Sequence, residues 1–311
     1  MAASDTRLIP PEPAGAAAVK ASAERIAPRL KALAPEAEKS RRLTREGIDL
    51  VRDHGLFKIL QPERSGGHQL TLRTHLDVVS ALSEGCVSTG WVVGVAHAHS
   101  WLIGHMPRQA QDDVYADNPN AFVAAVVGPR GKAVKRADGS FQLNGFWPFG
   151  SGSDYADWLM LGAEVVDEQG QTEDWGDFLI PPGDIDNLDD WHSAGLAGTG
   201  SHSLVGKNVT VPPHRFISMP ALFQGHSPGG AARGHTVQVL SGAGSGTGID
   251  WLGNRLREGF SGRLPRQYRG QSRGLYRART DRVATHADER CQCGNPGRCC
   301  RTAALPVRGH H

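Results

Sequence analysis

Two short stretches of the sequence carry the side chains best suited to chemistry, and the first spans residues 86–101. It reads CVSTGWVVGVAHAHSW, so it offers hydroxyls, the flat face of Trp91 and two histidines to a ligand. His97 and His99 are two positions apart, so on a helix they point about 200° apart and at most one can face a given pocket. The simpler alternative is a buried helix in which both histidines only pack against their neighbours.

The second stretch spans residues 145–158 and reads GFWPFGSGSDYADW, which places bare backbone beside aromatic side chains. Trp147 and Phe149 are two positions apart, so both rings are expected on one side of a strand. Glycines flank Ser151 and would let a planar heteroaromatic ring lie against the main chain, with N–H groups and the Ser151 hydroxyl at its polar edge. A strand that ends in an ordinary turn is the simpler alternative.

Other possible motifs do not support a site. Residues 195–201 read GLAGTGS, but no βαβ unit surrounds them and no lysine follows, so we predict a loop without a phosphate role. Residues 291–300 read CQCGNPGRCC, which matches none of the usual zinc-ligand spacings, and we predict no metal site. The sequence also lacks the GxSxG, HExxH and kinase patterns.

Composition narrows the class of protein. The 311 residues suffice for two domains, and the formal net charge of +2 argues against nucleic acid or an anionic membrane as the main partner. No apolar run approaches the ~20 residues that span a bilayer, and the first twenty residues do not resemble a signal peptide. We therefore expect a cytoplasmic protein that does not bind membranes.

The elements that must position these residues fall into two regions, which predict an α+β fold. Residues 1–117 are expected to form a helical domain, with an apolar stripe at three- and four-residue steps over residues 19–33. Thr44 is predicted to be the N-cap of the next helix and Gly55 to end it, and two further helices are expected at 72–85 and 87–105.

Residues 118–216 are expected to form a β domain. Apolar runs alternate there with turn signals, and Asp138–Gly139 lies between two alternating runs, which is typical of a hairpin. Residues 217–311 are expected to be an irregular tail. Residues 231–311 contain 14 Arg, 5 acidic residues and no Lys, so this part is either a disordered basic tail or a segment translated out of frame from GC-rich DNA.

Five segments, taken in order, resemble the oxygenase components of two-component flavin-dependent monooxygenases, which have the acyl-CoA dehydrogenase fold. The resemblance is to the 3-hydroxy-9,10-seco-androstatriene-dione hydroxylase and para-hydroxyphenylacetate hydroxylase group in particular. The segments are FKILQPERSGG, CVSTGWVVGVAHAHSW, GFWPFGSGSDYADW, DFLIPPGDIDNLDDWHSAGLAGTGS and NVTVPPHRF, and they cover roughly residues 40–230. The resemblance implies a helical N-terminal domain, a middle β-barrel domain, a C-terminal helical bundle and a homotetramer. No match to that bundle follows residue 231, so it is expected to be absent or replaced by the Arg- and Gly-rich tail.

The same resemblance implies the site residues. The positions that match its flavin contacts are Trp91, Ala125, Val126, Val127, Phe149, Gly150 and Ser151. His99 matches the active-site histidine, and Ser151 lies near flavin N5, so both are expected to be catalytic. Ala197 stands where relatives tend to have arginine, which is a departure from the pattern.

The implied function is hydroxylation of a phenolic substrate next to its hydroxyl group. A separate flavin reductase would supply reduced FMN or FAD (FMNH₂ or FADH₂), and O₂ would be the co-substrate, through a C4a-hydroperoxyflavin. An aromatic wall of Trp91, Trp147 and Phe149 would keep the pocket dry, and His99, titrating near neutrality, would take the phenolic proton. The alternatives are an acyl-CoA dehydrogenase-type flavoenzyme, an inactive truncated fragment, or a protein that binds nucleic acid through its tail.

Overall fold

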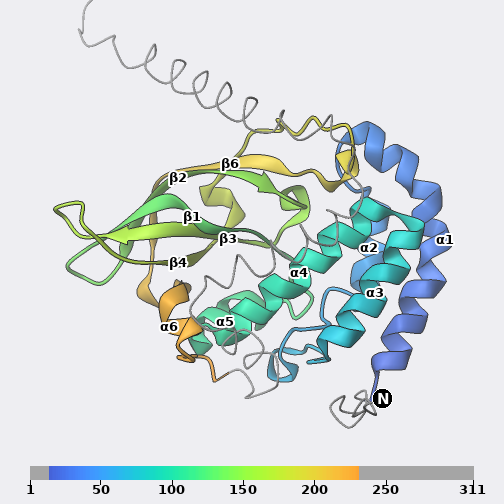
Figure 1. Cartoon of the computed structure of the whole chain (residues 1–311), viewed down its shortest axis with the longest axis horizontal. Coiled ribbons are helices and arrows are strands. Elements are labelled where there is room, and N and C mark those ends of the chain that lie inside the picture. Colours follow the sequence, from blue (N-terminus) through green and yellow to red (C-terminus); the bar gives the residue numbers. More distant parts are fainter. Residues whose placement is uncertain (1–13, 231–311) are drawn as a thin grey trace, which may run out of the picture. The chain divides into compact units, whose positions relative to one another are not determined.

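The computed structural model describes residues 14–230, and helices occupy its first half (Figure 1). They are α1 (Ala16–Ser40), α2 (Arg45–Asp53), α3 (Leu72–Gly85), α4 (Val87–His105) and α5 (Arg108–Tyr115). Helix α4 contacts β1 of the sheet and also α3, and α1 packs against α3. Helix α4 has the bounds predicted for it, and most of it is buried.

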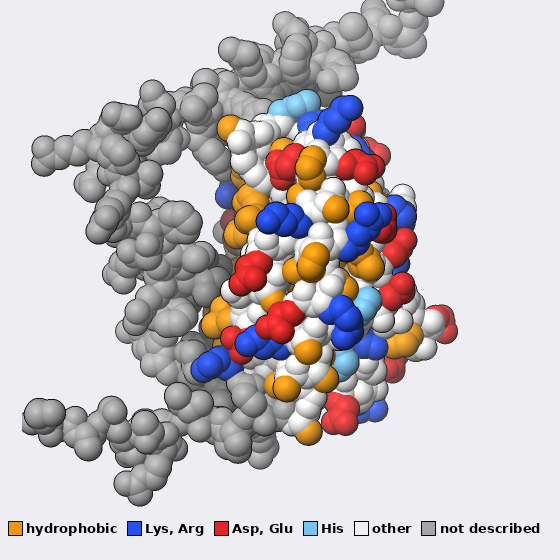
Figure 2. Space-filling model, turned by 90° about the vertical axis from the view of Figure 1, so that its right-hand side faces the viewer, with side chains coloured by type: hydrophobic (Ala, Val, Ile, Leu, Met, Phe, Trp, Pro, Cys, Tyr) orange, Lys and Arg blue, Asp and Glu red, His pale blue; other side chains and the backbone are white. Residues whose placement is uncertain are grey.

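The apolar stripe of α1 is buried as its spacing predicts. Its members Val19, Ala23, Ile26, Leu30 and Leu33 all lie in the interior. The opposite face of the helix is exposed, and on the side shown in Figure 2 the Lys and Arg side chains are interspersed with Asp and Glu. Burial of one stripe and solvation of the other face is what holds an amphipathic helix in place.

Local signals set the ends of α2. The Thr44 side chain accepts a hydrogen bond of 3.0 Å from the Gly47 amide, which satisfies one of the free N–H groups of the first turn. The helix ends at Asp53, and Gly55 follows with a φ of 66°, a conformation that glycine adopts without strain. Both predictions for this helix are confirmed.

Within residues 14–230, seven strands form one mixed sheet in the order β5-β6-β2-β1-β3-β4-β7. The strands are β1 (Val123–Lys135), β2 (Phe141–Gly150), β3 (Trp158–Val166), β4 (Thr172–Ile180), β5 (Asp186–Asn187), β6 (His202–Val211) and β7 (Phe216–Ser218). Strands β1 and β3 are parallel, and the other neighbours are antiparallel. Strands β1 and β2 form the hairpin predicted around Asp138–Gly139.

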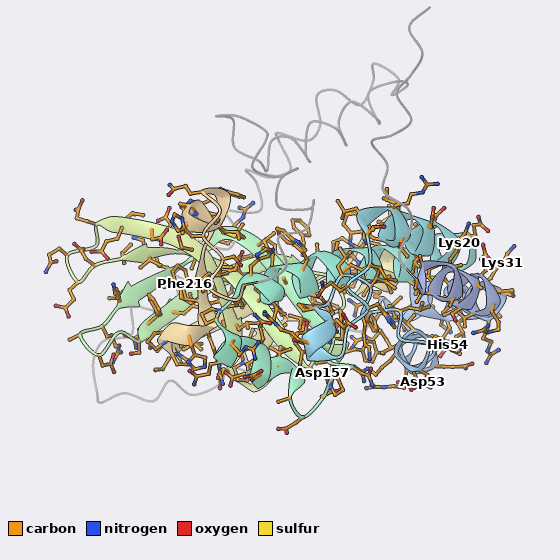
Figure 3. All side chains as sticks on the ribbon, turned by 90° about the horizontal axis from the view of Figure 1, so that it is seen from below. Lys20, Lys31, Asp53, His54, Asp157 and Phe216 are labelled. Atoms are coloured by element: carbon orange, nitrogen blue, oxygen red, sulfur yellow. The ribbon has the colours of Figure 1, made fainter. Side chains whose placement is uncertain are left out.

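An ion pair ties α2 to the loop before β3. Arg52 Nη2 lies 2.9 Å from Asp157 Oδ2, and the same oxygen accepts a hydrogen bond of 2.8 Å from the Phe122 amide. In Figure 3, Asp157 lies between Phe216 on the side of the sheet and His54 on the side of the helices. This contact fixes the helical layer against the start of β1.

The last elements lie beyond the predicted boundary at residue 216. Strand β7 ends at Ser218, and a short helix, α6 (Met219–Phe223), follows it, with the Ser218 hydroxyl accepting from the Ala221 amide. Residues 217–223 are therefore regular, which corrects the expectation of an irregular segment there. A three-residue strand is too short to show the alternation that would have predicted it.

The architecture is α+β, with a helical layer followed by a sheet. Within residues 14–230, none of the helices combines the length and the apolar composition that a membrane span requires. The predictions for the Arg-rich tail and for the cysteines at 291–300 concern residues outside the described range.

Candidate active site

The first turn of α4 meets the turn after β2 at a single polar contact. The Trp91 indole Nε1 donates a hydrogen bond of 3.1 Å to Ser151 Oγ. Ser151 is 8% exposed, whereas Trp91 is 47% exposed and presents its ring to solvent. The two residues that the sequence singled out on separate segments are therefore brought together, with a flat aromatic face beside a nearly buried hydroxyl.

Ser151 is also the first member of a chain of hydroxyls. Its Oγ lies 2.7 Å from Ser201 Oγ, and Ser201 Oγ lies 2.7 Å from Thr199 Oγ1. Thr199 in turn donates a hydrogen bond of 2.8 Å to the Leu196 carbonyl. The sequence reasoning treated residues 195–201 as a loop and missed this chain of hydroxyls. The signal that could have found it is the pair of hydroxyls two positions apart in GTGS.

Phe149 has a strained backbone conformation at the end of β2, where the turn begins. Its φ is 70°, a region that bulky residues rarely adopt, and strained backbone of this kind clusters at functional sites. The ring is 55% exposed and meets Trp191 edge to face, with centroids 6.0 Å apart. Phe149 lies two residues before Ser151 in the sequence, and Trp91 is hydrogen-bonded to Ser151 in the fold. Both therefore expose aromatic surface near this hydroxyl.

Trp147 does not belong to this aromatic wall, which corrects the prediction. Its side chain is wholly buried in the sheet core, and its Nε1 donates a hydrogen bond of 2.7 Å to the Gly162 carbonyl. The alternation expected for a strand fails because the register of β2 against β6 shifts between Trp147 and Gly150, and Phe149 adopts a positive φ within that shift. The two rings therefore face different surroundings.

The space that a Cβ would need at each glycine beside Ser151 is filled by the protein's own side chains. A Cβ on Gly150 would lie 2.9 Å from a methyl of Leu204, and one on Gly152 would lie 2.7 Å from the ring of Phe122. The amides are also used internally, since Ser151 N–H donates to the Phe149 carbonyl and Gly152 N–H donates to the Thr199 carbonyl. Both amides are thus used within the protein, and the Ser151 hydroxyl is a polar group that this turn can offer, while the close approach of a planar ring to the backbone stays a prediction.

The predicted β1 segment divides between two faces. Ala125 packs against the core around α5 and α6, and Val126 packs against the core between the helices and the sheet. Val127 is 49% exposed. Because side chains alternate along a strand, Ala125 and Val127 share a face that Val126 does not.

His99 is held by the start of the same strand. Its Nδ1 lies 2.8 Å from the Val123 carbonyl, so Nδ1 carries the hydrogen and Nε2 carries a lone pair. No described residue bonds to Nε2. Burial lowers the pKa of His99 to about 4, opposed by the hydrogen bond to Val123. The expectation that His99 titrates near neutrality is therefore wrong, because a buried imidazole loses its hydration when charged.

His97 has a different role from His99, as the 200° separation predicts. Its Nε2 donates to the Leu56 carbonyl at 2.6 Å, and its Nδ1 accepts from His75 Nδ1 at 2.8 Å. Burial and the neighbouring His75 lower the pKa of His97 to about 3. Both ring nitrogens are used, so His97 holds α4 against the chain after α2.

Glu38 is a further residue that the sequence reasoning missed. One carboxylate oxygen accepts from Ser88 Oγ at 2.8 Å and from the Gly198 amide at 3.1 Å, and the other accepts from the Ala197 amide at 3.1 Å. The end of α1 therefore fixes the start of α4 and the 3₁₀ turn Ala197–Thr199 in one position. Both elements contribute to the Ser151 site.

A charged cluster holds the loop that carries Trp191. The Arg42 guanidinium bridges Asp154 at 2.9 Å and Asp189 at 2.7 Å. The wholly buried His202 lies 3.4 Å from each carboxylate, and its Nδ1 accepts from the Trp191 amide at 3.1 Å. Burial lowers the pKa of His202, although Asp154 opposes this. The cluster thereby supports the aromatic side of the site.

Comparison with known proteins gives consistent matches. Residues 15–118 match the family described as acyl-CoA dehydrogenase, N-terminal domain. The chain is 36% identical over 217 residues to the flavin-dependent monooxygenase oxygenase subunit HsaA of Mycobacterium tuberculosis, covering 70% of this chain and 54% of that protein. It is 36% identical over 206 residues to the FADH₂-dependent resorcinol hydroxylase oxygenase component of a Rhizobium species, covering 66% of this chain and 50% of that protein.

The fold shows the same likeness. A crystal structure of the HsaA monooxygenase from M. tuberculosis superposes with a TM-score of 0.68 and 30% sequence identity, covering 78% of this chain and 68% of that one. The chain spans about half the length of the curated relatives it matches.

Proposed function

The chain belongs to the family of flavin-dependent monooxygenase oxygenase components built on the acyl-CoA dehydrogenase fold, and we propose that it acts as such a component. In this proposal a separate flavin reductase supplies reduced FMN or FAD, O₂ is the co-substrate, and a phenolic compound is hydroxylated. The resorcinol hydroxylase and the HsaA protein to which it is similar are named as oxygenase components, which implies a reductase partner for those proteins. Assembly as a homotetramer remains a prediction.

The observation that carries the proposal is the contact between Trp91 and Ser151. A flat ring with one polar edge needs an apolar face to stack on and a hydrogen-bonding group at its rim. Trp91 and Phe149 leave about half of their surface exposed, and Ser151 Oγ lies at the edge of the Trp91 ring. These residues fit an isoalloxazine ring, and Ala125 and Val127 would line it from β1. Gly150 and Val126 would contribute backbone only.

Bound reduced flavin would supply the electrons and the reactivity toward O₂. The chain's own part is to exclude water, which the exposed rings of Trp91 and Phe149 would do on contact with the flavin. Ser151 would hold the hydrogen-bonding edge of the ring. His99 is neutral at physiological pH and offers Nε2 as an acceptor, so it would accept the hydrogen bond of the phenolic hydroxyl.

The proposal is tested by binding and then by turnover. The 311-residue chain is titrated anaerobically with reduced FMN and reduced FAD, and we expect saturable binding of at least one of them. The loaded protein is then mixed with O₂ and simple phenols, and we expect a hydroxylated product that contains ¹⁸O from ¹⁸O₂. Absence of any affinity for reduced flavin would refute the proposal.

A further inference from the structure

The hydroxyl chain behind Ser151 has only one arrangement of hydrogens. Thr199 Oγ1 lies 2.8 Å from the Leu196 carbonyl, and a carbonyl has no hydrogen, so the hydrogen in that contact belongs to Thr199. The contact of 2.7 Å between Thr199 and Ser201 must then use the Ser201 hydrogen. The contact of 2.7 Å between Ser201 and Ser151 must use the Ser151 hydrogen.

The same assignment of hydrogens determines which hydrogen bonds Ser151 can make to a ligand. Its hydrogen points to Ser201, and one of its two lone pairs accepts from Trp91 Nε1. One lone pair is left. Ser151 can therefore accept a hydrogen bond from a ligand and cannot donate one while the chain of hydroxyls is intact. All four contacts in this chain are between 2.7 and 3.1 Å, so each is a good hydrogen bond.

We propose that Ser201 and Thr199 are positioning residues that turn the Ser151 hydroxyl into a pure acceptor, so that the site prefers reduced over oxidised flavin. This inference rests on the proposed function. The family resemblance implies that Ser151 lies near flavin N5, where reduced flavin carries a hydrogen that can be donated to the Ser151 lone pair. Oxidised flavin carries a lone pair on N5, so the same contact would bring two lone pairs together.

The size of the preference follows from one hydrogen bond. A neutral hydrogen bond contributes about tenfold or somewhat less in affinity, and an unmatched buried acceptor costs a similar factor. We therefore expect the ratio of the Kd for oxidised flavin to the Kd for reduced flavin to fall about tenfold when the chain of hydroxyls is broken. For a two-electron couple, a tenfold fall in this ratio lowers the midpoint potential of the bound flavin by about 30 mV.

The test compares variants of the full-length chain. In Ser201→Ala the Ser151 hydrogen is free to point at the ligand, so oxidised flavin should gain affinity relative to reduced flavin. Thr199→Val should shift the ratio in the same direction, because Ser201 can then donate to Ser151, and Thr199→Ser should keep the wild-type ratio. Ser203→Ala is the matched control, since Ser203 is equally buried but donates to Asp190 and lies outside the chain of hydroxyls.

The readouts are both Kd values and the midpoint potential of the bound flavin, neither of which depends on turnover. If Ser201→Ala and Thr199→Val weaken both redox states equally, the hydroxyls are structural and the inference is wrong. If Ser201→Ala does not fold, Thr199→Val and Thr199→Ser still decide it. If the wild-type chain binds neither redox state, the failure belongs to the proposed function and not to this inference alone.

Discussion

Trp91 Nε1 lies 3.1 Å from Ser151 Oγ, although the two residues are sixty positions apart and belong to different layers. Trp91 lies near the start of the central helix α4 (Val87–His105), and Ser151 follows the last residue of β2. The candidate site therefore exists only when the helical layer is docked on the sheet. The Arg52–Asp157 ion pair and the Glu38 contacts are among the polar links that maintain this docking.

The first prediction concerns the Trp91 ring. Trp91→Ala removes both the flat face and the N–H, and we expect the Kd for reduced flavin to rise about tenfold or more, because an aromatic contact contributes about 1 kcal/mol beyond its buried area. Trp91→Phe keeps a flat face and should raise the Kd by less. Because Trp91 is 47% exposed, Tm should change little in either variant.

The control for that prediction is Trp175→Phe, since Trp175 lies on β4 and packs against Phe223 of α6. Anaerobic titration should give it the wild-type Kd. An unchanged Kd in Trp91→Ala would show that this ring does not contact flavin.

The second prediction concerns His99. His99→Ala should lower the yield of hydroxylated product per reduced flavin about tenfold or more, because the acceptor for the phenolic hydroxyl is lost. Its pKa of about 4 means that the imidazole is already neutral above about pH 5. The yield should therefore show no transition from His99 between pH 6 and pH 8. Binding of reduced flavin should remain within about twofold of wild type.

His54→Ala is the matched control, because His54 follows the last residue of α2 and its ring bonds to the Leu50 carbonyl, away from the site. It should keep the wild-type yield. A His99→Ala variant that hydroxylates as well as wild type would remove His99 from the proposed chemistry.

The helices and the first hairpin were predictable because their signals are local. The stripe of α1, the Thr44 cap and the turn at Asp138–Gly139 each depend on neighbours within a few positions. The strand β7 was missed because three residues carry no periodic signal. Its place beside β4 is set by tertiary pairing.

The site was predicted only where local sequence patterns mark its residues. Trp91 and Ser151 lie in segments with unusual composition, and both reach the site. Trp147 was misplaced because no local pattern encodes the register shift and positive φ that end the alternation of β2. Thr199 and Ser201 were missed because their partner lies some fifty positions away and only folding brings the hydroxyls together.

The third prediction tests whether the glycines of the Ser151 turn are packing devices. Gly152 has a φ of 75°, and an added Cβ would lie 2.7 Å from the Phe122 ring and 2.8 Å from Val92. We expect Gly152→Ala to lower the free energy of unfolding by about 2–4 kcal/mol, from backbone strain and overpacking together. Urea denaturation measures the change.

Gly170→Ala separates the two causes. Gly170 has a φ of 83°, but an added Cβ would meet nothing within 4 Å. Strain alone should cost about 1–2 kcal/mol there. If both variants lost the same free energy of unfolding, the crowding around Gly152 would be relieved by small shifts of its neighbours at no energetic cost.

The fourth prediction concerns Asp177, a carboxyl in the middle of β4 that is 1% exposed. Neither of its oxygens makes a well-aligned hydrogen bond to a described residue. Burial raises the pKa of Asp177 to about 7, opposed by the nearby Gly128 amide. In the unfolded chain an aspartate titrates near ~3.9. Between about pH 4 and pH 7 the folded state therefore holds a proton that the unfolded state has released.

A proton held only by the folded state makes stability fall as the pH rises. The free energy of unfolding should decrease through this window by up to about 1.4 kcal/mol per pH unit from this group, and the loss should be complete above about pH 7. Asp177→Asn cannot ionise, so urea denaturation at several pH values should show a smaller slope between pH 4 and pH 7 than in wild type. Asp184→Asn, at an exposed position, should keep the wild-type slope. Identical slopes in wild type and Asp177→Asn would mean that Asp177 is ionised in the folded protein throughout this range, with a cation or ordered water compensating its charge.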